Sequence, residues 1–111
     1  MRGLWGPYFG EGDLNLPLLK TIRTQSEILV IVCDEELLGK KFKNGEFRLD
    51  VKESFYKGEK ASLDDCLVAL RSATIGNLVG SIVEHAVKAG IIEPGNVLHF
   101  KKVPHAQLVR L

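Results

Sequence analysis

The apolar run Ile28–Cys33 constrains the fold of this chain more than any other segment, because charged residues follow it directly. Its residues are apolar at every position, a pattern typical of a strand that is buried on both faces. Asp34, Glu35 and Glu36 follow at once, and a glycine and two lysines come after a single predicted helical turn. Since functional groups often lie where rigid strands end, this junction is the first candidate for a site.

The composition indicates one globular domain and limits the kinds of partner that the protein can bind. With 111 residues, 45% of them apolar and 26% charged, the chain can bury one core and is not intrinsically disordered. With a net charge of +1, the protein as a whole has no electrostatic field that would attract nucleic acid or membrane. An anionic partner would therefore need a local basic patch. No apolar run is long enough to cross a bilayer. The two cysteines lack zinc-ligand spacing and predict a reducing cytoplasm.

Periodicity predicts several strands and two helices. Ser62 begins a first helix, with Asp65 in the capping-box position. Apolar residues spaced by three and four predict a second helix over 75–89, which Gly90 ends. The segments with strand character are 18–24, 27–33, 46–52 and 97–103.

This order of elements predicts an α+β fold. We expect a two-layer sandwich over residues 18–111, in which one mixed sheet of four to five strands carries both helices on one face. The predicted core combines the apolar faces of strand 46–52 and the helices. Its members are Phe47, Leu49, Val51, Cys66, Leu70, Val79, Ile82 and Val83.

Residues 1–17 differ from the rest because they contain four glycines, two prolines and three aromatic residues. Such a composition does not favour regular structure. Trp5, Tyr8 and Phe9 predict an extension that is held by packing on the domain or on a second subunit. The second arrangement would make the protein a homodimer.

The acidic turn has two interpretations. Asp34, Glu35 and Glu36 offer the oxygen ligands that Mg²⁺ prefers, but three adjacent acids on one turn do not all converge. A well-capped turn, closed by Gly39, is the simpler interpretation, so no metal is assigned. A reactive thiolate is not expected at Cys33, because neighbouring carboxylates raise the pKa of a thiol. Cys33 is instead expected to be a small buried side chain.

Among the histidines, His105 is the best candidate for a general base. Pro104 stiffens the backbone before it, and Gln107 offers a second polar group near by. A candidate site therefore comprises Cys33, Asp34 and Glu35 from the acidic turn together with His105 and Gln107.

Gly76 and Gly80 lie one turn apart on the predicted second helix, with Asn77 between them. Glycine inside a helix costs about 1 kcal/mol relative to alanine, so we expect a close neighbour there: the first helix, a strand or the twin helix of a dimer. A phosphate-binding loop would need a lysine and a preceding strand, and segment 76–80 has neither.

Lysines gather in two short runs. Exposed lysines are usually only solvated surface. If the two runs meet on one face, they would form a patch for RNA phosphates, and Phe55 and Tyr56 could stack on bases. The runs are Lys40, Lys41 and Lys43, and Lys101 and Lys102.

Four separated segments resemble a known family. They read Cys-Asp-Glu-Glu-Leu-Leu-Gly-Lys at 33–40, Phe-Tyr-Lys-Gly-Glu at 55–59, Asn-Leu-Val-Gly at 77–80 and Val-Pro-His-Ala-Gln at 103–107. Together they are similar to the small archaeal proteins grouped as domain of unknown function 424, over residues 18–109. The resemblance implies an archaeal cytoplasmic protein with a two-layer α+β sandwich. It implies no activity, cofactor or catalytic residue.

Two kinds of function stay open. The small size and the lack of a nucleophile–base constellation favour a non-enzymatic binding or interaction module, within a ribonucleoprotein or with another protein. The alternative is a small enzyme with its site where Cys33, Asp34 and His105 converge. No catalytic residue and no cofactor is assigned from the sequence.

Overall fold

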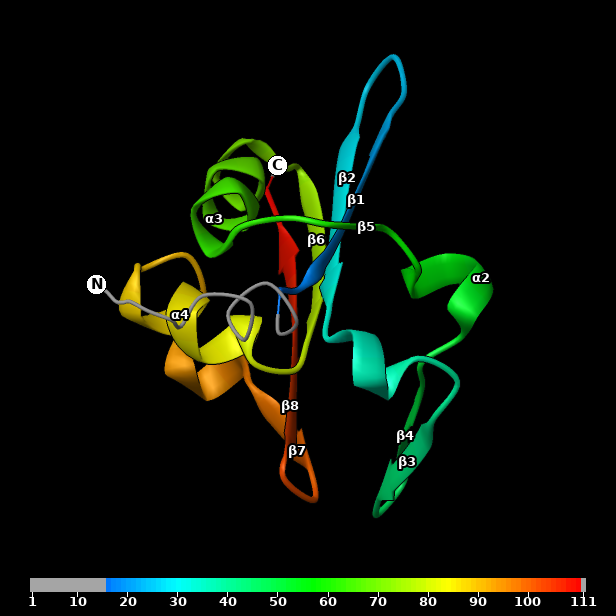
Figure 1. Ribbon diagram of the computed structural model, residues 1–111. Coiled ribbons are helices and arrows are strands. Elements are labelled where there is room, and N and C mark those ends of the chain that lie inside the picture. The colour runs from blue at the N-terminus through cyan, green and yellow to red at the C-terminus, as the bar shows by residue number, and fades with distance from the viewer. Residues whose placement is uncertain (1–15, 111) are drawn as a thin grey trace, which may run out of the picture.

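A computed structural model describes residues 16–110 of the chain. Its centre is a mixed six-stranded sheet with the strand order β5-β1-β2-β6-β8-β7 (Figure 1). The parallel pair is β2 with β6, and the other neighbours are antiparallel. The strands are β1 (Leu18–Arg23), β2 (Ile28–Cys33), β5 (Glu59–Lys60), β6 (Ile75–Val79), β7 (Leu98–Phe100) and β8 (Val103–Val109).

Two long connections join strands of this sheet, one from β2 to β6 and one from β6 to β7. The first connection contains the 3-10 turn η1 (Glu35–Leu37), the hairpin of β3 (Lys41–Asn44) and β4 (Phe47–Asp50), helix α2 (Glu53–Tyr56), strand β5 and helix α3 (Leu63–Ser72). The second contains helix α4 (Ile82–Lys88) and the 3-10 turn η2 (Pro94–Asn96).

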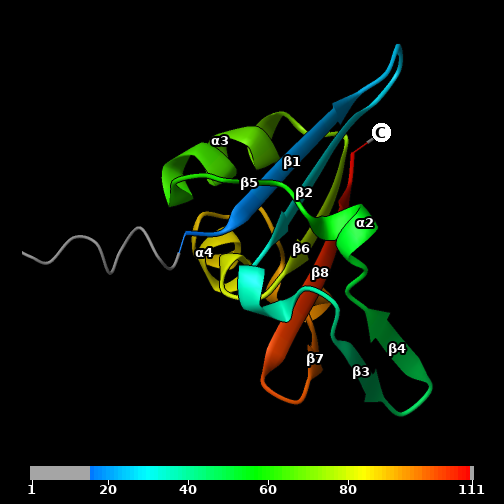
Figure 2. The ribbon, with the colours of Figure 1, turned by 45° about the vertical axis from the view of Figure 1, so that its right-hand side comes forward.

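Different layers cover the two faces of the sheet. Helices α3 and α4 lie on one face, while η1, the β3–β4 hairpin and α2 lie on the other (Figures 1 and 2). Side chains alternate across a strand, so Val30 and Val32 of β2 pack with the helices, whereas Ile31 and Cys33 pack with the second layer. All four side chains are fully buried, as the apolar run predicted.

The α+β class is confirmed, and its details differ from expectation. The sheet has six strands and not four to five, and a third helix, α2, belongs to a layer on the opposite face. The two predicted N-terminal strands form β1 and β2. Helix α3 begins after Ser62, whose hydroxyl accepts a 3.1 Å hydrogen bond from the Asp65 N–H. The predicted strand 97–103 is split into β7 and β8 at Lys101, which has a φ of +61°.

The predicted helix over 75–89 is wrong in its first half. Residues Ile75–Val79 form β6, and only Ile82–Lys88 form helix α4. The apolar positions 75, 78 and 79 fit a helical period, but they also fit a short strand that is buried on both faces. Pairing with β2 and β8 selects the strand. Gly80, with a φ of +100°, then provides a turn that a helix does not allow.

Seven of the eight predicted core residues are buried, and Phe47 is the exception with 57% of its surface exposed. The β3–β4 hairpin forms a separate two-stranded sheet that extends beyond the main sheet (Figure 2). The base of the hairpin reaches the core through Phe42 and Leu49, and Val51 follows directly after β4. The predicted packing of Trp5, Tyr8 and Phe9 lies outside the described residues.

Candidate functional site

The parallel arrangement of β2 and β6 brings the ends of these two strands to the same edge of the sheet. Asp34 follows β2, and Gly80 and Ser81 follow β6. The carboxylate of Asp34 accepts hydrogen bonds from the Ser81 backbone N–H at 2.8 Å and from the Ser81 hydroxyl at 2.7 Å. The sequence suggested that Asp34 caps its own turn. Its side chain makes no capping hydrogen bond there and instead ties η1 to the start of α4.

Cys33 lies beneath this connection and is fully buried. Its thiol donates a 3.2 Å hydrogen bond to the Asp34 carbonyl. Burial, together with the carboxylates of Asp34 and Glu36, raises the pKa of the thiol to about 12. At neutral pH the group is protonated, and a protonated thiol is a poor nucleophile. Cys33 thus acts as a small core side chain.

A second set of polar groups lies on the sheet face opposite α3 and α4, and we call Tyr56, Asn77 and His105 the polar cluster. The Tyr56 hydroxyl donates to Asn77 Oδ1 at 3.0 Å, and His105 Nε2 lies 3.3 Å from the same oxygen. Since that oxygen only accepts, the contact is a hydrogen bond when His105 carries a proton on Nε2. Burial lowers the pKa of His105 and raises that of Tyr56, so both groups stay neutral at pH 7.

The sequence placed Cys33, Asp34 and His105 in one site, and the structure separates them. In the sheet, Cys33 pairs with Val79, and Val79 pairs with His105. Two strand spacings, roughly 10 Å, therefore lie between Cys33 and His105. The Asp34 carboxylate is engaged with Ser81 at the strand ends. These residues do not form a nucleophile–base pair.

The other members of that candidate site are also dispersed. Glu35 is exposed and forms a 3.7 Å ion pair with Lys60 of β5. Gln107 is exposed and pairs across the sheet with Asn77, so it lies beside the polar cluster. The structure places no group of three or more metal-binding side chains of His, Cys, Asp or Glu together within residues 16–110.

The two glycines do not lie on a helix, because Gly76 is part of strand β6 and Gly80 follows it. Of the close neighbours that the sequence left open, the structure places strand β8 and the first helix, α3, against Gly76. Gly76 is buried in β6, where an added Cβ would lie 3.1 Å from Leu108 Cδ2. At Gly80 an added Cβ would collide with the Asp34 carboxylate. Close packing does explain both glycines, but the neighbours are side chains within the same domain.

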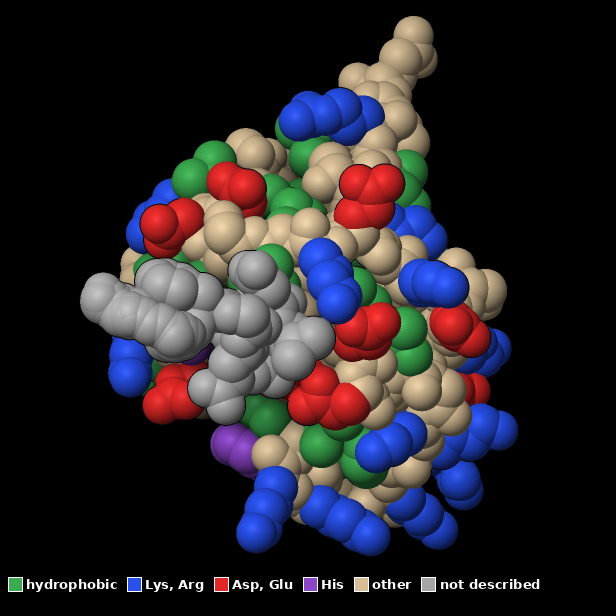
Figure 3. All heavy atoms as spheres, in the orientation of Figure 1, with side chains coloured by type: hydrophobic (Ala, Val, Ile, Leu, Met, Phe, Trp, Pro, Cys, Tyr) green, Lys and Arg blue, Asp and Glu red, His purple; other side chains and the backbone are tan. Residues whose placement is uncertain are grey.

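The two lysine runs lie on adjacent hairpins, because Asn44 of β3 donates a 2.8 Å hydrogen bond from Nδ2 to the His99 carbonyl of β7. Basic side chains gather where these hairpins lie, at the lower end of the molecule in Figure 3. We call this surface the basic end. It consists of Lys40, Lys41, Lys43, Arg48, Lys101 and Lys102, all of them exposed.

The aromatic residues near the basic end are not the ones that the sequence suggested. Tyr56 is only 5% exposed and uses its hydroxyl in the polar cluster, so its ring is not free to stack on a base. Phe55 is 37% exposed but packs edge-on against Tyr56, with the ring centroids 4.9 Å apart. Phe47 of β4 is an exposed aromatic residue on one of the hairpins of the basic end. Sequence reasoning missed it as a binding residue, because the alternation along this strand assigned it to the core.

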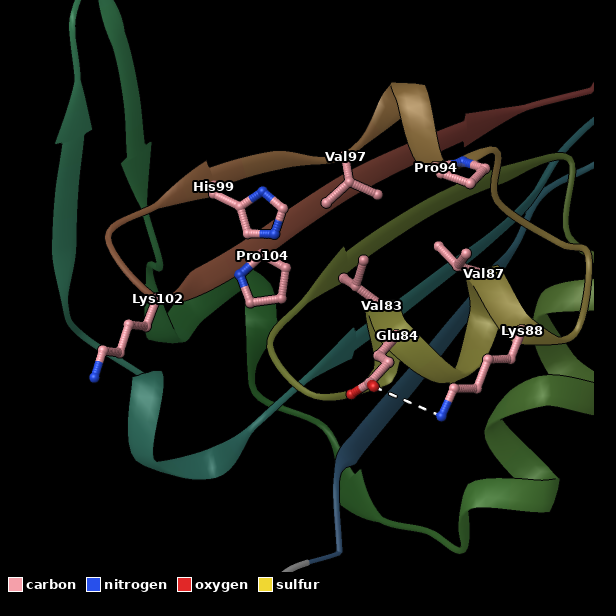
Figure 4. A pocket seen from close by; sticks show the side chains of 9 residues that line it. All are labelled: Val83, Glu84, Val87, Lys88, Pro94, Val97, His99, Lys102 and Pro104. Atoms are coloured by element: carbon pink, nitrogen blue, oxygen red, sulfur yellow. Dashed lines mark ion pairs between the residues drawn. The ribbon is translucent and has the colours of Figure 1, made fainter.

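Sequence reasoning also missed an apolar groove of about 390 Å³ between α4 and β7. Val83 and Val87 of α4 face Val97 and Pro104 across it (Figure 4). On its rim Glu84 and Lys88 form a 3.6 Å ion pair. The groove lies between elements that are distant in the sequence, so no local pattern indicated it.

The fold and these sites define a small α+β domain with a polar cluster on its sheet and a basic end. The chain belongs to the family described as "Protein of unknown function (DUF424)", which matches residues 22–111. This confirms the resemblance seen in the sequence.

A similar solved structure is the crystal structure of an uncharacterized conserved protein from Methanopyrus kandleri. It has a TM-score of 0.67 and 27% sequence identity, and the match covers 86% of this chain and 94% of that chain. It supports an archaeal origin for this protein. No curated protein matches the chain. Within residues 16–110, no helix is long and apolar enough to cross a membrane.

Proposed function

We propose that this protein is a small non-enzymatic interaction module that binds RNA phosphates through its basic end, as a component of a cytoplasmic ribonucleoprotein. The observation that carries the proposal is the hydrogen bond from Asn44 to the His99 carbonyl. It joins residues 55 positions apart in the sequence and sets the two lysine-bearing hairpins side by side. Because the chain as a whole is nearly neutral, it needs a local basic patch of this kind to bind a polyanion.

Charge is distributed unevenly between the hairpins and the rest of the chain. Of the 15 basic and 14 acidic residues, six basic and two acidic ones lie in segments 40–50 and 98–103. The two acids are Glu46 and Asp50. The hairpins are therefore positive while the remainder is negative, an asymmetry that would orient the protein on an anionic partner.

The cations of the basic end form no ion pair with an acidic side chain of the described part of the chain. The ion pairs formed within the described part of the chain join Glu53 to Lys57, Glu35 to Lys60 and Glu84 to Lys88. All of these lie outside the basic end. Its lysines thus remain exposed for phosphate oxygens, and binding them would release counterions from RNA.

Fluorescence anisotropy with a labelled mixed RNA pool, measured at several salt concentrations, tests this proposal. Binding at low salt should weaken steeply as salt rises, and every phosphate that the protein no longer binds should reduce the log–log slope by about 0.7. The test variant changes Lys40, Lys41, Lys101 and Lys102 to glutamine. The matched control also removes four positive charges, by changing Arg23, Lys57, Lys60 and Lys88 to glutamine, since their side chains are exposed and lie outside the basic end.

Loss of affinity and slope in the first variant only would support the proposal. No binding by the wild-type protein at low salt, or equal losses in both variants, would contradict it. A pull-down from native extract with and without ribonuclease adds a separate readout. A partner that resists ribonuclease would indicate protein recognition in place of RNA binding.

A further inference from the structure

We propose that Phe47 stacks on an unpaired base, so that the basic end prefers single-stranded over duplex RNA. This inference rests on the proposed function and assigns the class of RNA. Phe47 is the first residue of β4 and is 57% exposed, although it is a large apolar side chain on a strand. It lies next to the tip of the hairpin, which turns at Gly45 with a φ of +62°.

The position of the ring is set by its cross-strand partner. Phe47 pairs with Asn44, and Asn44 is held to the His99 carbonyl. Residues that pair across strands share one face of the sheet, so the ring lies on the face of the hairpin that is turned toward β7. Lys101 and Lys102 follow β7 directly. The ring thus lies on the side of the hairpin that faces the β7–β8 hairpin, which carries Lys101 and Lys102.

Farther along the same face of β4, the apolar side chain is buried. Leu49 is 4% exposed and packs into the core, whereas Phe47, nearer the tip of the hairpin, is mostly exposed. On the opposite face, Lys43 and Arg48 form a cross-strand pair of cations. An exposed aromatic ring on a surface that also carries several cations is the combination that binds single strands, with stacking on bases and ion pairs to phosphates.

The geometry discriminates between the two forms of RNA for a physical reason. In a duplex the base faces are stacked on each other, so that only phosphates and groove edges are accessible. A duplex would therefore gain from the lysines but not from Phe47. A single strand would gain from both, because its bases can unstack and cover the ring.

The experiment compares a short unstructured RNA with the duplex that it forms with its complement. Anisotropy titrations are made with the full chain, Phe47→Ala and Phe47→Tyr. Val68→Ala is the matched control, since Val68 is 68% exposed on α3 and is not part of the basic end. Thermal melts of all the variants check that the fold is retained.

We expect Phe47→Ala to weaken binding of the single strand by roughly 5- to 150-fold, the effect of losing one base–aromatic stack. Duplex binding should not change, and Phe47→Tyr should restore the single-strand affinity. Unaltered single-strand binding by Phe47→Ala would overturn the inference. An equal loss for both RNAs would overturn it as well, because such a loss would indicate a damaged hairpin.

The two levels of the proposal fail in different ways. If the lysine variant no longer binds RNA and Phe47→Ala still does so fully, the proposed function stands and the stacking role fails. If the wild-type protein binds neither RNA, the proposed function itself fails. A ribonuclease-resistant partner that Phe47→Ala no longer retains would overturn the stacking role in favour of a protein contact.

Discussion

Asp34 and Ser81, 47 positions apart in the sequence, are joined by two hydrogen bonds through both carboxylate oxygens of the aspartate. The contact links the turn after β2 to the start of α4 and leaves no room for a side chain at Gly80. The acidic turn is therefore first a structural joint. A charged acceptor that serves two donors contributes more to stability than an ordinary exposed acid.

Replacing Asp34 with alanine should lower the free energy of unfolding by about 2–4 kcal/mol, because the variant cannot form either hydrogen bond to a charged group. Urea denaturation measures this change. Glu36→Ala is the matched control, since Glu36 is exposed on the same turn, and it should alter stability by about 0.5 kcal/mol or less. Similar values for the two variants would contradict the structural role of Asp34.

Leu70→Ala should cost about 2–5 kcal/mol, because Leu70 is fully buried between α3 and the sheet and its truncation leaves a cavity. Val68→Ala on the same helix should change stability by only about 0.5 kcal/mol. Differential scanning calorimetry of both variants compares them. An unchanged melting temperature in Leu70→Ala would refute the packing of α3 on the sheet.

Burial of His105 should make the protein less stable at mildly acidic pH. Burial lowers its folded-state pKa below the ordinary value of 6.5, so the unfolded chain binds the proton more readily. The free energy of unfolding should fall as the pH drops through 6.5 toward the lower folded value, and the contribution should be complete above 6.5. Denaturation at several pH values shows the slope, and His105→Gln should reduce it. An identical slope in that variant would assign the effect to other groups.

Neither cysteine should react with a thiol reagent in the native protein at pH 8. Burial raises the pKa of Cys33 to about 12 and that of Cys66 to about 11, so the thiolate fraction is very small. Absorbance assays with a disulfide reagent should show slow native labelling and rapid labelling of two thiols in denaturant. Fast labelling of Cys33 in the folded protein would revive it as a candidate nucleophile.

Homodimer formation stays a prediction, and it depends on the aromatic residues of the N-terminal segment, because the glycines at 76 and 80 are enclosed within one domain. Light scattering on the full chain and on a variant lacking residues 1–15 would compare their masses. The deletion stops there because Pro17 is buried and its carbonyl accepts a hydrogen bond from Ala61. A monomeric full chain at high concentration would contradict the prediction, whereas a dimer that dissociates on deletion would support it.

Features that depend on neighbours in the sequence were predictable. The burial of β2 on both faces followed from apolar residues at every position, and the start of α3 followed from Ser62 and Asp65. The family resemblance also rested on local motifs. In these cases the physical cause, an apolar run or a capping hydroxyl, lies within a few residues of its effect.

Only the tertiary structure decided whether Ile75–Val79 is helix or strand, since its apolar spacing fits both and the pairing with β2 and β8 selects one. The same holds for the polar cluster, in which Asn77 joins a tyrosine and a histidine from other elements. It holds as well for the exposure of Phe47, which depends on where the domain ends. These features arise from contacts between distant segments, whose free energy no local pattern contains.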